Sequence, residues 1–233
     1  MNTKMCEKED LNIGLVLQYQ VAPKGTFDAD TLVRHARDFG FRGVSIKDGD
    51  DSQIEALQAA CQKYAIKFCQ KRPAEKLISP DVLAKLIAAR LDNMNIYFEV
   101  ELNQDGSIKP ESDPAMKTLR TWIDRFGHAY YESRADHEIK ADEDNVHVFY
   151  NAIAKYQRYV FIHIPLEKSI ELKHVPQVEK AAWIDTRNEL EFKQDGDRLH
   201  IELKRKEDSE QFSVYGLRLQ LHRPEDDLGK TEY

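Results

Sequence analysis

Three aspartates follow a short predicted strand and are the first candidates for chemistry in this chain. Asp48, Asp50 and Asp51 come directly after residues 43–47, which read as a buried strand. Carboxylates at the carboxyl end of a parallel strand are where (β/α) proteins place reactive groups. The alternative interpretation is structural: a tight turn followed by the N-terminal cap of the next helix. Asp48 is retained as a candidate catalytic residue, with this alternative beside it.

Two glutamates form the second candidate group. Glu99 and Glu101 flank Val100 in the apolar run 96–102, so a strand would place both carboxylates on one face. Two neighbouring carboxylates can share acid–base or nucleophilic work. The alternative is a partly solvated sheet face, on which Lys47 could neutralise the two glutamates if it faces the same cavity. Buried charges need such partners.

Composition narrows the function classes. The net charge of −7 and the scattered Lys and Arg residues argue against nucleic-acid binding. No apolar run approaches the ~18 residues of a membrane span, and the charged N-terminus lacks the apolar core of a secretory signal. Cys6, Cys61 and Cys69 form no C-x-x-C pair, which favours buried, reduced thiols. We therefore expect a cytoplasmic protein that has no membrane or nucleic-acid partner.

The first part of the chain alternates between strand and helix patterns. Apolar residues at helical spacing follow each apolar run, which predicts a parallel sheet covered by helices. The predicted strands are 13–19, 43–47, 66–70 and 96–102, and the predicted helices are 28–39, 52–64 and 79–93. About four β-α units result, and we assign them to a domain of residues 1–135.

The second part, residues 136–233, has a different pattern. A polar linker (137–144) is followed by segments of alternating polarity, and Asp195-Gly196 is a hairpin signal. The predicted strands are 146–150, 159–164, 190–192, 199–203 and 215–221. Strands without intervening helices favour an antiparallel β-sandwich. The fold class is therefore α/β followed by all-β.

The segment between the two parts carries a resemblance. A strand at 96–102, an Asp105-Gly106 turn, a helix that contains Trp122 and ends at Gly127, and the pair Tyr130-Tyr131 follow in order. This order resembles the last barrel strand and helix of α-L-fucosidases of glycoside hydrolase family 29, where the chain leaves a (β/α) barrel for a β-sandwich. We expect Trp122 to be buried at this junction.

The resemblance extends to both ends of the chain, but the middle of the family's barrel is missing. Only eight residues separate Gln70 from Ser79, where the family has several β-α units and its nucleophile in a Trp-x-Asp-Gly context. The strings Trp122-Ile123-Asp124 and Trp183-Ile184-Asp185 lie in a predicted helix and in the sandwich, so we read both as coincidence. The resemblance thus implies a truncated barrel-like domain without the nucleophile.

The family's sugar-binding histidines are also replaced. Its His-Trp-Gly after the first strand reads Gln18-Tyr19-Gln20 here, and its His-His before Asp48-Gly49 reads Ile46-Lys47. By position, the resemblance implies ligand-binding residues among those that follow the strands. These are Gln18, Tyr19, Lys47, Asp48 and Asn103.

Three functions remain open at this stage. The first is a fucosidase-like protein that has lost catalysis and binds carbohydrate or a partner protein. The second is an active glycoside hydrolase with a rebuilt site that uses Asp48, Glu99 or Glu101. The third is a structural assembly module. We expect no cofactor and no metal, because the histidines are dispersed and the chain has no glycine-rich nucleotide loop.

A homodimer is a further expectation. An open half-barrel has two unpaired edges, and restoring the family's pairing of its last and first strands in one chain would need a left-handed crossover. Pairing 96–102 of one chain with 13–19 of a second avoids that crossover. Two half-barrels would then bury both edges.

Overall fold

A parallel β-sheet with helices forms the first part of the structure, a computed structural model that describes residues 10–23, 25–78, 81–205 and 212–223. The chain divides into two compact units, Met1–Asp124 and Arg125–Tyr233. The predicted division lies later, after residue 135. None of the helices in the described residues is long and apolar enough to cross a membrane.

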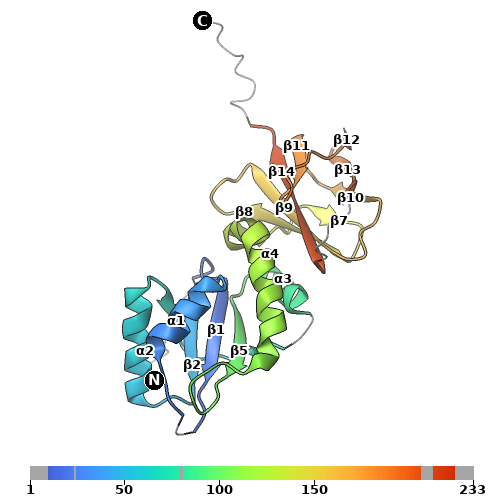
Figure 1. Ribbon diagram of the computed structural model, residues 1–233. Helices are drawn as coiled ribbons and strands as arrows, with labels where there is room; N and C mark the ends of the chain where they lie inside the picture. Colours follow the sequence, from blue (N-terminus) through green and yellow to red (C-terminus); the bar gives the residue numbers. More distant parts are fainter. Residues whose placement is uncertain (1–9, 24, 79–80, 206–211, 224–233) are drawn as a thin grey trace, which may run out of the picture. The chain divides into compact units, whose positions relative to one another are not determined.

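The first unit contains a five-stranded sheet in the order β3-β2-β1-β5-β4, and every neighbouring pair is parallel. Its strands are β1 (Leu15–Gln20), β2 (Gly43–Lys47), β3 (Lys67–Phe68), β4 (Glu75–Lys76) and β5 (Ile96–Glu101). Its helices are α1 (Ala29–Asp38), α2 (Asp51–Lys63) and α3 (Val82–Leu91), and the short 3-10 helix η1 (Pro110–Ser112) precedes α4 (Asp113–Glu132) (Figure 1). The predicted strands and helices are therefore present, although β4 was missed and the predicted start of α3 at Ser79 lies outside the described residues.

Local chemistry explains the helix boundaries around β2. Asp50 caps α2, because its carboxylate accepts a hydrogen bond from the Gln53 backbone N–H (2.9 Å) and the Gln53 Oε1 accepts one from the Asp50 N–H (3.0 Å). Asp28 caps α1 in a similar way through Thr31. The interpretation of the aspartates after β2 as a turn and helix cap is thus confirmed for Asp50.

The pairing of β1 with β5 corrects one prediction. The two strands pair within one chain, from Leu15 opposite Ile96 to Gln20 opposite Glu101. The predicted pairing of these strands between two chains is therefore wrong. The reason is the connection between β3 and β4, whose path carries no periodic sequence pattern that would predict it.

That connection, residues 69–74, crosses the face of the sheet opposite to α1. Tyr19 points toward α1, since its hydroxyl donates to the Leu32 carbonyl (2.8 Å). Gln18 therefore points to the other face, where it bonds the backbone of Arg72. The 69–74 segment runs over the opposite face from α1 and leads the chain back across the sheet in the opposite direction. The two reversals together leave the crossover from β3 to β4 right-handed. The left-handed crossover that motivated the interchain pairing does not arise.

Helix α4 is longer than predicted. It continues through Gly127 to Glu132, so the prediction that Gly127 ends the helix is wrong. Glycine costs a helix only about 1 kcal/mol relative to alanine. Burial of Phe126, Ala129 and Tyr130 on either side of the glycine outweighs that cost.

The second unit contains two antiparallel sheets. The five-stranded sheet has the order β11-β14-β9-β8-β6, and the four-stranded sheet has the order β12-β13-β10-β7. Their strands are β6 (Ser133–Ala135), β7 (Lys140–Ala141), β8 (Val146–Asn151), β9 (Gln157–His163), β10 (Ser169–Lys173), β11 (Val178–Trp183), β12 (Phe192–Asp195), β13 (Arg198–Glu202) and β14 (Val214–Leu221). Strand β7 lies inside the predicted linker 137–144, which is therefore not a plain linker. The hairpin at Asp195-Gly196 is confirmed, and Gly196 has a φ of 60°.

The cysteines of the described residues are structural. Cys61 and Cys69 are free and buried, as predicted, and Cys6 lies outside the described residues. Burial is the main reason that the pKa of the Cys61 thiol rises to about 12. A thiol with that pKa is protonated at neutral pH and is a poor nucleophile.

Candidate functional site

Polar side chains of β1, β2 and β5 meet on the sheet face opposite to α1, which we call the inner face. Gln18 of β1 lies opposite Ser45 of β2 and Glu99 of β5 in the strand register. In (β/α) proteins, ligands bind at the carboxyl ends of the parallel strands. The predicted residues Gln18, Lys47 and Glu99 are thus brought together.

Gln18 is fully engaged within the protein. Its amide nitrogen donates to the Arg72 carbonyl (3.1 Å) and to Glu99 Oε2 (3.3 Å). Its amide oxygen accepts from Ser45 Oγ (3.3 Å) and from the Arg72 backbone N–H (3.1 Å). A glutamine amide has two N–H donors and two acceptor lone pairs, so these four bonds use its capacity. Gln18 therefore holds the 69–74 segment in place rather than presenting a free group to a ligand.

The 69–74 segment covers part of the inner face. Cys69 packs with Val16 and Tyr97, and Ala74 packs against the same cluster. The Arg72 guanidinium lies 5.9 Å from the centre of the Tyr97 ring, within cation–π range. The chain's own segment thus occupies space that an open half-barrel would leave to solvent or to a ligand.

Glu99 is buried and paired with Lys47. Only 8% of Glu99 is exposed, and its Oε2 accepts from Lys47 Nζ at 2.8 Å. This hydrogen bond is the main reason that the pKa of Lys47 is raised. The sequence-based suggestion that Lys47 neutralises a glutamate on this face is confirmed by this contact.

Glu101 lies one pleat further along β5 and is held by two lysines. Its carboxylate accepts from Lys109 Nζ (2.6 Å) and from Lys76 Nζ (3.3 Å). These hydrogen bonds, Lys109 first, lower the pKa of Glu101. Glu101 is therefore ionised at neutral pH. Neither lysine was among the residues predicted from sequence.

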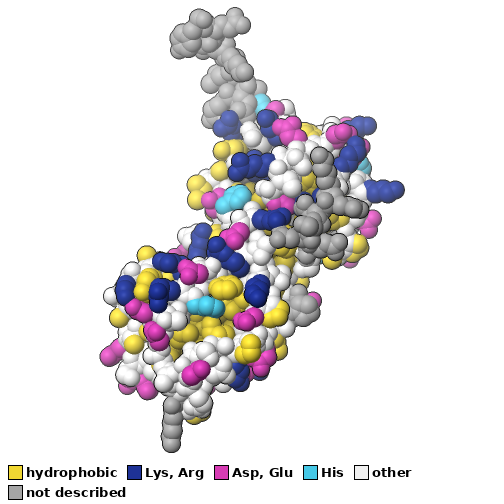
Figure 2. Space-filling view, viewed as in Figure 1, with side chains coloured by type: hydrophobic (Ala, Val, Ile, Leu, Met, Phe, Trp, Pro, Cys, Tyr) yellow, Lys and Arg dark blue, Asp and Glu magenta, His cyan; other side chains and the backbone are white. Residues whose placement is uncertain are grey.

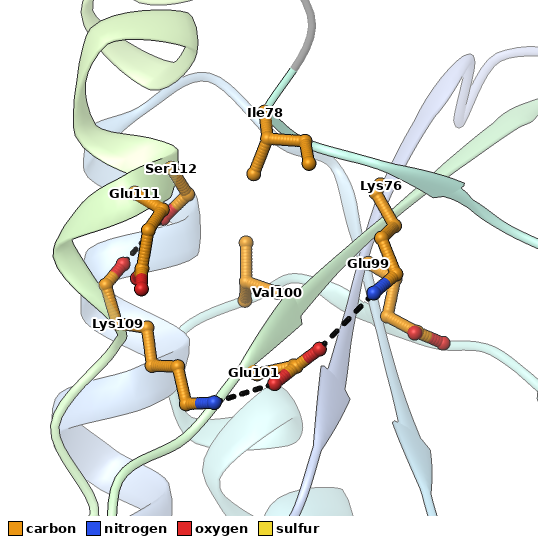
Figure 3. A pocket seen from close by; sticks show the side chains of 8 residues that line it. All are labelled: Lys76, Ile78, Glu99, Val100, Glu101, Lys109, Glu111 and Ser112. Atoms are coloured by element: carbon orange, nitrogen blue, oxygen red, sulfur yellow. Dashed lines mark hydrogen bonds and ion pairs between the residues drawn. The ribbon is translucent and has the colours of Figure 1, made fainter.

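A cavity of about 200 Å³ opens beside these groups, between β4, β5 and η1 (Figure 3). Figure 3 shows the Glu101 carboxylate between Lys76 and Lys109, with Ile78 and Val100 on the other side of the space. Glu99, Glu111 and Ser112 complete the lining. The Ser112 hydroxyl donates to the Lys109 carbonyl at 3.0 Å, which links η1 to this wall.

The remaining predicted site residues lie elsewhere. Tyr19 is fully buried on the helix side of β1, and burial raises the pKa of its hydroxyl well above the usual value. Asp48 is exposed after β2, with a φ of 61°. Asn103 donates to Ser107 Oγ (3.0 Å) in the turn after β5 and lines a neighbouring hollow of about 320 Å³. The structure therefore does not bring these three residues into the cluster around Glu99.

The two glutamates differ in charge environment from the carboxyl pair that glycoside hydrolysis uses. A retaining glycosidase needs one carboxylate as nucleophile and a second carboxyl group whose raised pKa lets it act as an acid. Here Lys109 and Lys76 lower the pKa of Glu101, and Lys47 bonds Glu99. Among the described residues, no group of three His, Cys, Asp or Glu side chains could hold a metal ion. Charged side chains of both signs are interspersed on the face seen in Figure 2.

The fold was compared with solved structures. It matches an α-fucosidase of Thermotoga maritima solved in complex with fucose, with a TM-score of 0.70 and 8% identity over 90% of this chain and 96% of that chain. The fold is similar to that of fucosidases. A bacterial fucosidase with a triazole-containing inhibitor gives a TM-score of 0.72 and 9% identity, over 91% and 94% of the two chains.

A third fucosidase structure also has a fold similar to that of this chain. The α-L-fucosidase of glycoside hydrolase family 29 from Bacteroides thetaiotaomicron gives a TM-score of 0.68 and 10% identity over 91% and 95% of the two chains. No protein-family model matches the sequence, and no curated protein matches it either. The resemblance to α-L-fucosidases is therefore confirmed in the fold, at very low sequence identity.

Proposed function

We propose that this fucosidase-like protein has lost glycoside hydrolysis and retains a carbohydrate-binding or partner-binding role. The observation that carries the proposal is the pairing of both candidate glutamates with lysines. Lys47 holds Glu99, while Lys109 and Lys76 hold Glu101. Such groups can bind hydroxyls but are poorly suited to donate a proton.

The architecture that we propose is a truncated (β/α) barrel followed by a β-sandwich. Two features support it. The parallel sheet has a helix between β1 and β2 and between β2 and β3, and two antiparallel sheets follow. The short 69–74 segment stands where the family's barrel has several further β-α units. A shortening at this point would remove the nucleophile that the resemblance implies.

A homodimer remains a separate proposal. Because β1 and β5 pair within the chain, a second copy would have to use the β3 and β4 edges, which are two residues long each. Light scattering tests it, since twice the mass of one chain supports the dimer and the mass of one chain contradicts it.

Carbohydrate binding is tested on a glycan array with fluorescently labelled protein. We expect signal above background on a subset of glycans, and we expect Glu101→Gln to reduce it, because that variant weakens the Lys109–Glu101–Lys76 contacts. Lys63→Gln, which alters an exposed ion pair with Asp30 away from the cavity, is the matched control. Absence of signal on every glycan would favour partner binding or a structural module instead.

A further inference from the structure

The cavity beside Glu101 offers two kinds of surface to a ligand. Ile78 and Val100 form an apolar side, and Ile78 is 58% exposed. The charged groups of Glu101, Lys76 and Lys109 form the opposite side (Figure 3). A sugar ring has a similar division, with C–H groups on its faces and hydroxyls at its rim. Small-molecule sites commonly combine apolar lining with a few polar groups in this way.

The part of the inner face under the 69–74 segment is a weaker candidate for a ligand. The hydrogen-bonding groups of Gln18 are used within the protein, and the 69–74 segment packs on this face. A ligand there would have to displace the segment and break these buried bonds. Leaving buried polar groups without partners is costly. The cavity needs no such rearrangement.

The charged side chains that line the cavity determine which class of sugar it can bind. Two lysines of the cavity wall face three glutamates, Glu99, Glu101 and Glu111. Lysines bond both Glu99 and Glu101, so the ammonium and carboxylate charges there largely offset each other. An added carboxylate would meet Glu111 and Glu101 without an unpaired lysine to receive it, and like charges repel. Hydroxyls can donate to the carboxylates and accept from the ammonium groups.

We infer that this cavity, rather than the part of the inner face that the 69–74 segment covers, is the carbohydrate site, and that it takes one neutral monosaccharide unit. The inference rests on the proposed function and specifies its site and ligand class. The volume of about 200 Å³ sets the size, because it lies below the ~300–1,000 Å³ of pockets for drug-sized ligands. Glu101 and Lys109 bind the hydroxyls, and Ile78 and Val100 contact the C–H face.

Titration of ¹⁵N-labelled protein with methyl α-L-fucoside and methyl β-D-glucuronide, followed by NMR, tests the inference. We expect the neutral glycoside to shift the amide signals of Ile78 and Lys109, and the uronide to bind at least fivefold more weakly. Ile78→Ser should weaken binding of the neutral glycoside severalfold without affecting folding, because this side chain is largely exposed. Lys109→Met should weaken it at least fivefold, with circular dichroism as the folding check.

A control variant and three outcomes separate the site from the function. Lys117→Met changes an exposed lysine of α4 and should leave binding unchanged. Binding of the neutral glycoside that neither Ile78→Ser nor Lys109→Met weakens would overturn the cavity while leaving the proposed function standing. Equal or tighter binding of the uronide would overturn the ligand class. Failure of a wider panel of neutral glycosides to bind would overturn carbohydrate binding itself.

Discussion

Replacing Trp122 by alanine is expected to destabilise the protein by about 3–5 kcal/mol, the usual cost of removing a large buried aromatic side chain. Trp122 is fully buried in α4, which confirms the expectation from the sequence. The cost has two parts, the lost burial of the indole and the cavity that remains where the structure cannot collapse.

Urea unfolding followed by circular dichroism measures this effect. Thr118→Ala is the matched control, since Thr118 is an exposed residue of the same helix and should change the free energy of unfolding by no more than about 0.5 kcal/mol. Equal stability of the Trp122→Ala and Thr118→Ala proteins would show that the indole is not buried in solution.

Removing the Asp185 carboxylate should destabilise the second unit by a similar amount. Asp185 accepts two hydrogen bonds from the Arg205 guanidinium, at 3.1 and 2.5 Å, and its side chain is 1% exposed. The guanidinium also lies 4.3 Å from the centre of the Tyr215 ring and 5.1 Å from that of Trp183. Breaking a buried ion pair on one side commonly costs about 3–5 kcal/mol, because the other charge stays buried.

The Asp185→Ala protein is compared with Glu189→Ala by the same urea method. Glu189 pairs with Lys180 at 3.9 Å, and both side chains are more than half exposed, so this variant should cost about 0–1 kcal/mol. A similar loss in both variants would mean that the Asp185–Arg205 pair is solvated in solution. The double variant Asp185→Ala with Arg205→Met should recover part of the loss, because it removes both charges.

Strong periodicity made most of the first unit predictable. The apolar residues of α1 recur on one face, and β2 carries Val44 and Ile46 in a short segment bounded by turn residues, so both elements were located closely. Strand β4 was missed because it comprises only Glu75 and Lys76, which carry no apolar pattern. Its pairing with β5 depends on the path of the 69–74 segment. Gln18, which is far from that segment in sequence, holds it through a hydrogen bond to the Arg72 carbonyl.

Irregular pairing explains part of what was missed in the second unit. Strand β11 has a register shift between Val178 and Lys180, which interrupts the alternation that predicts a strand. Strand β10 is different, because Ile170 and Leu172 do alternate with polar residues and are buried, so it could have been predicted.

The candidate site was predictable only in part. The shared face of Glu99 and Glu101 follows from the two-residue period of a strand, and the contact of Glu99 with Lys47 was anticipated. Lys76 and Lys109 could not be assigned to the site from the sequence. Lys76 reaches Glu101 from a two-residue strand, and Lys109 reaches it from the loop before η1. Tyr19 was assigned to the site by position in the family motif, but the pleat turns it toward α1.

Hydrolysis of 4-nitrophenyl α-L-fucoside by the purified protein tests most directly whether catalysis has been lost. Because lysines hold Glu101 ionised and bond Glu99, we predict nitrophenol release no faster than in buffer alone. Loss of one essential carboxylate normally lowers the rate by orders of magnitude. Clear release that disappears in Glu101→Gln or Asp48→Asn would contradict the proposal and identify an active glycoside hydrolase.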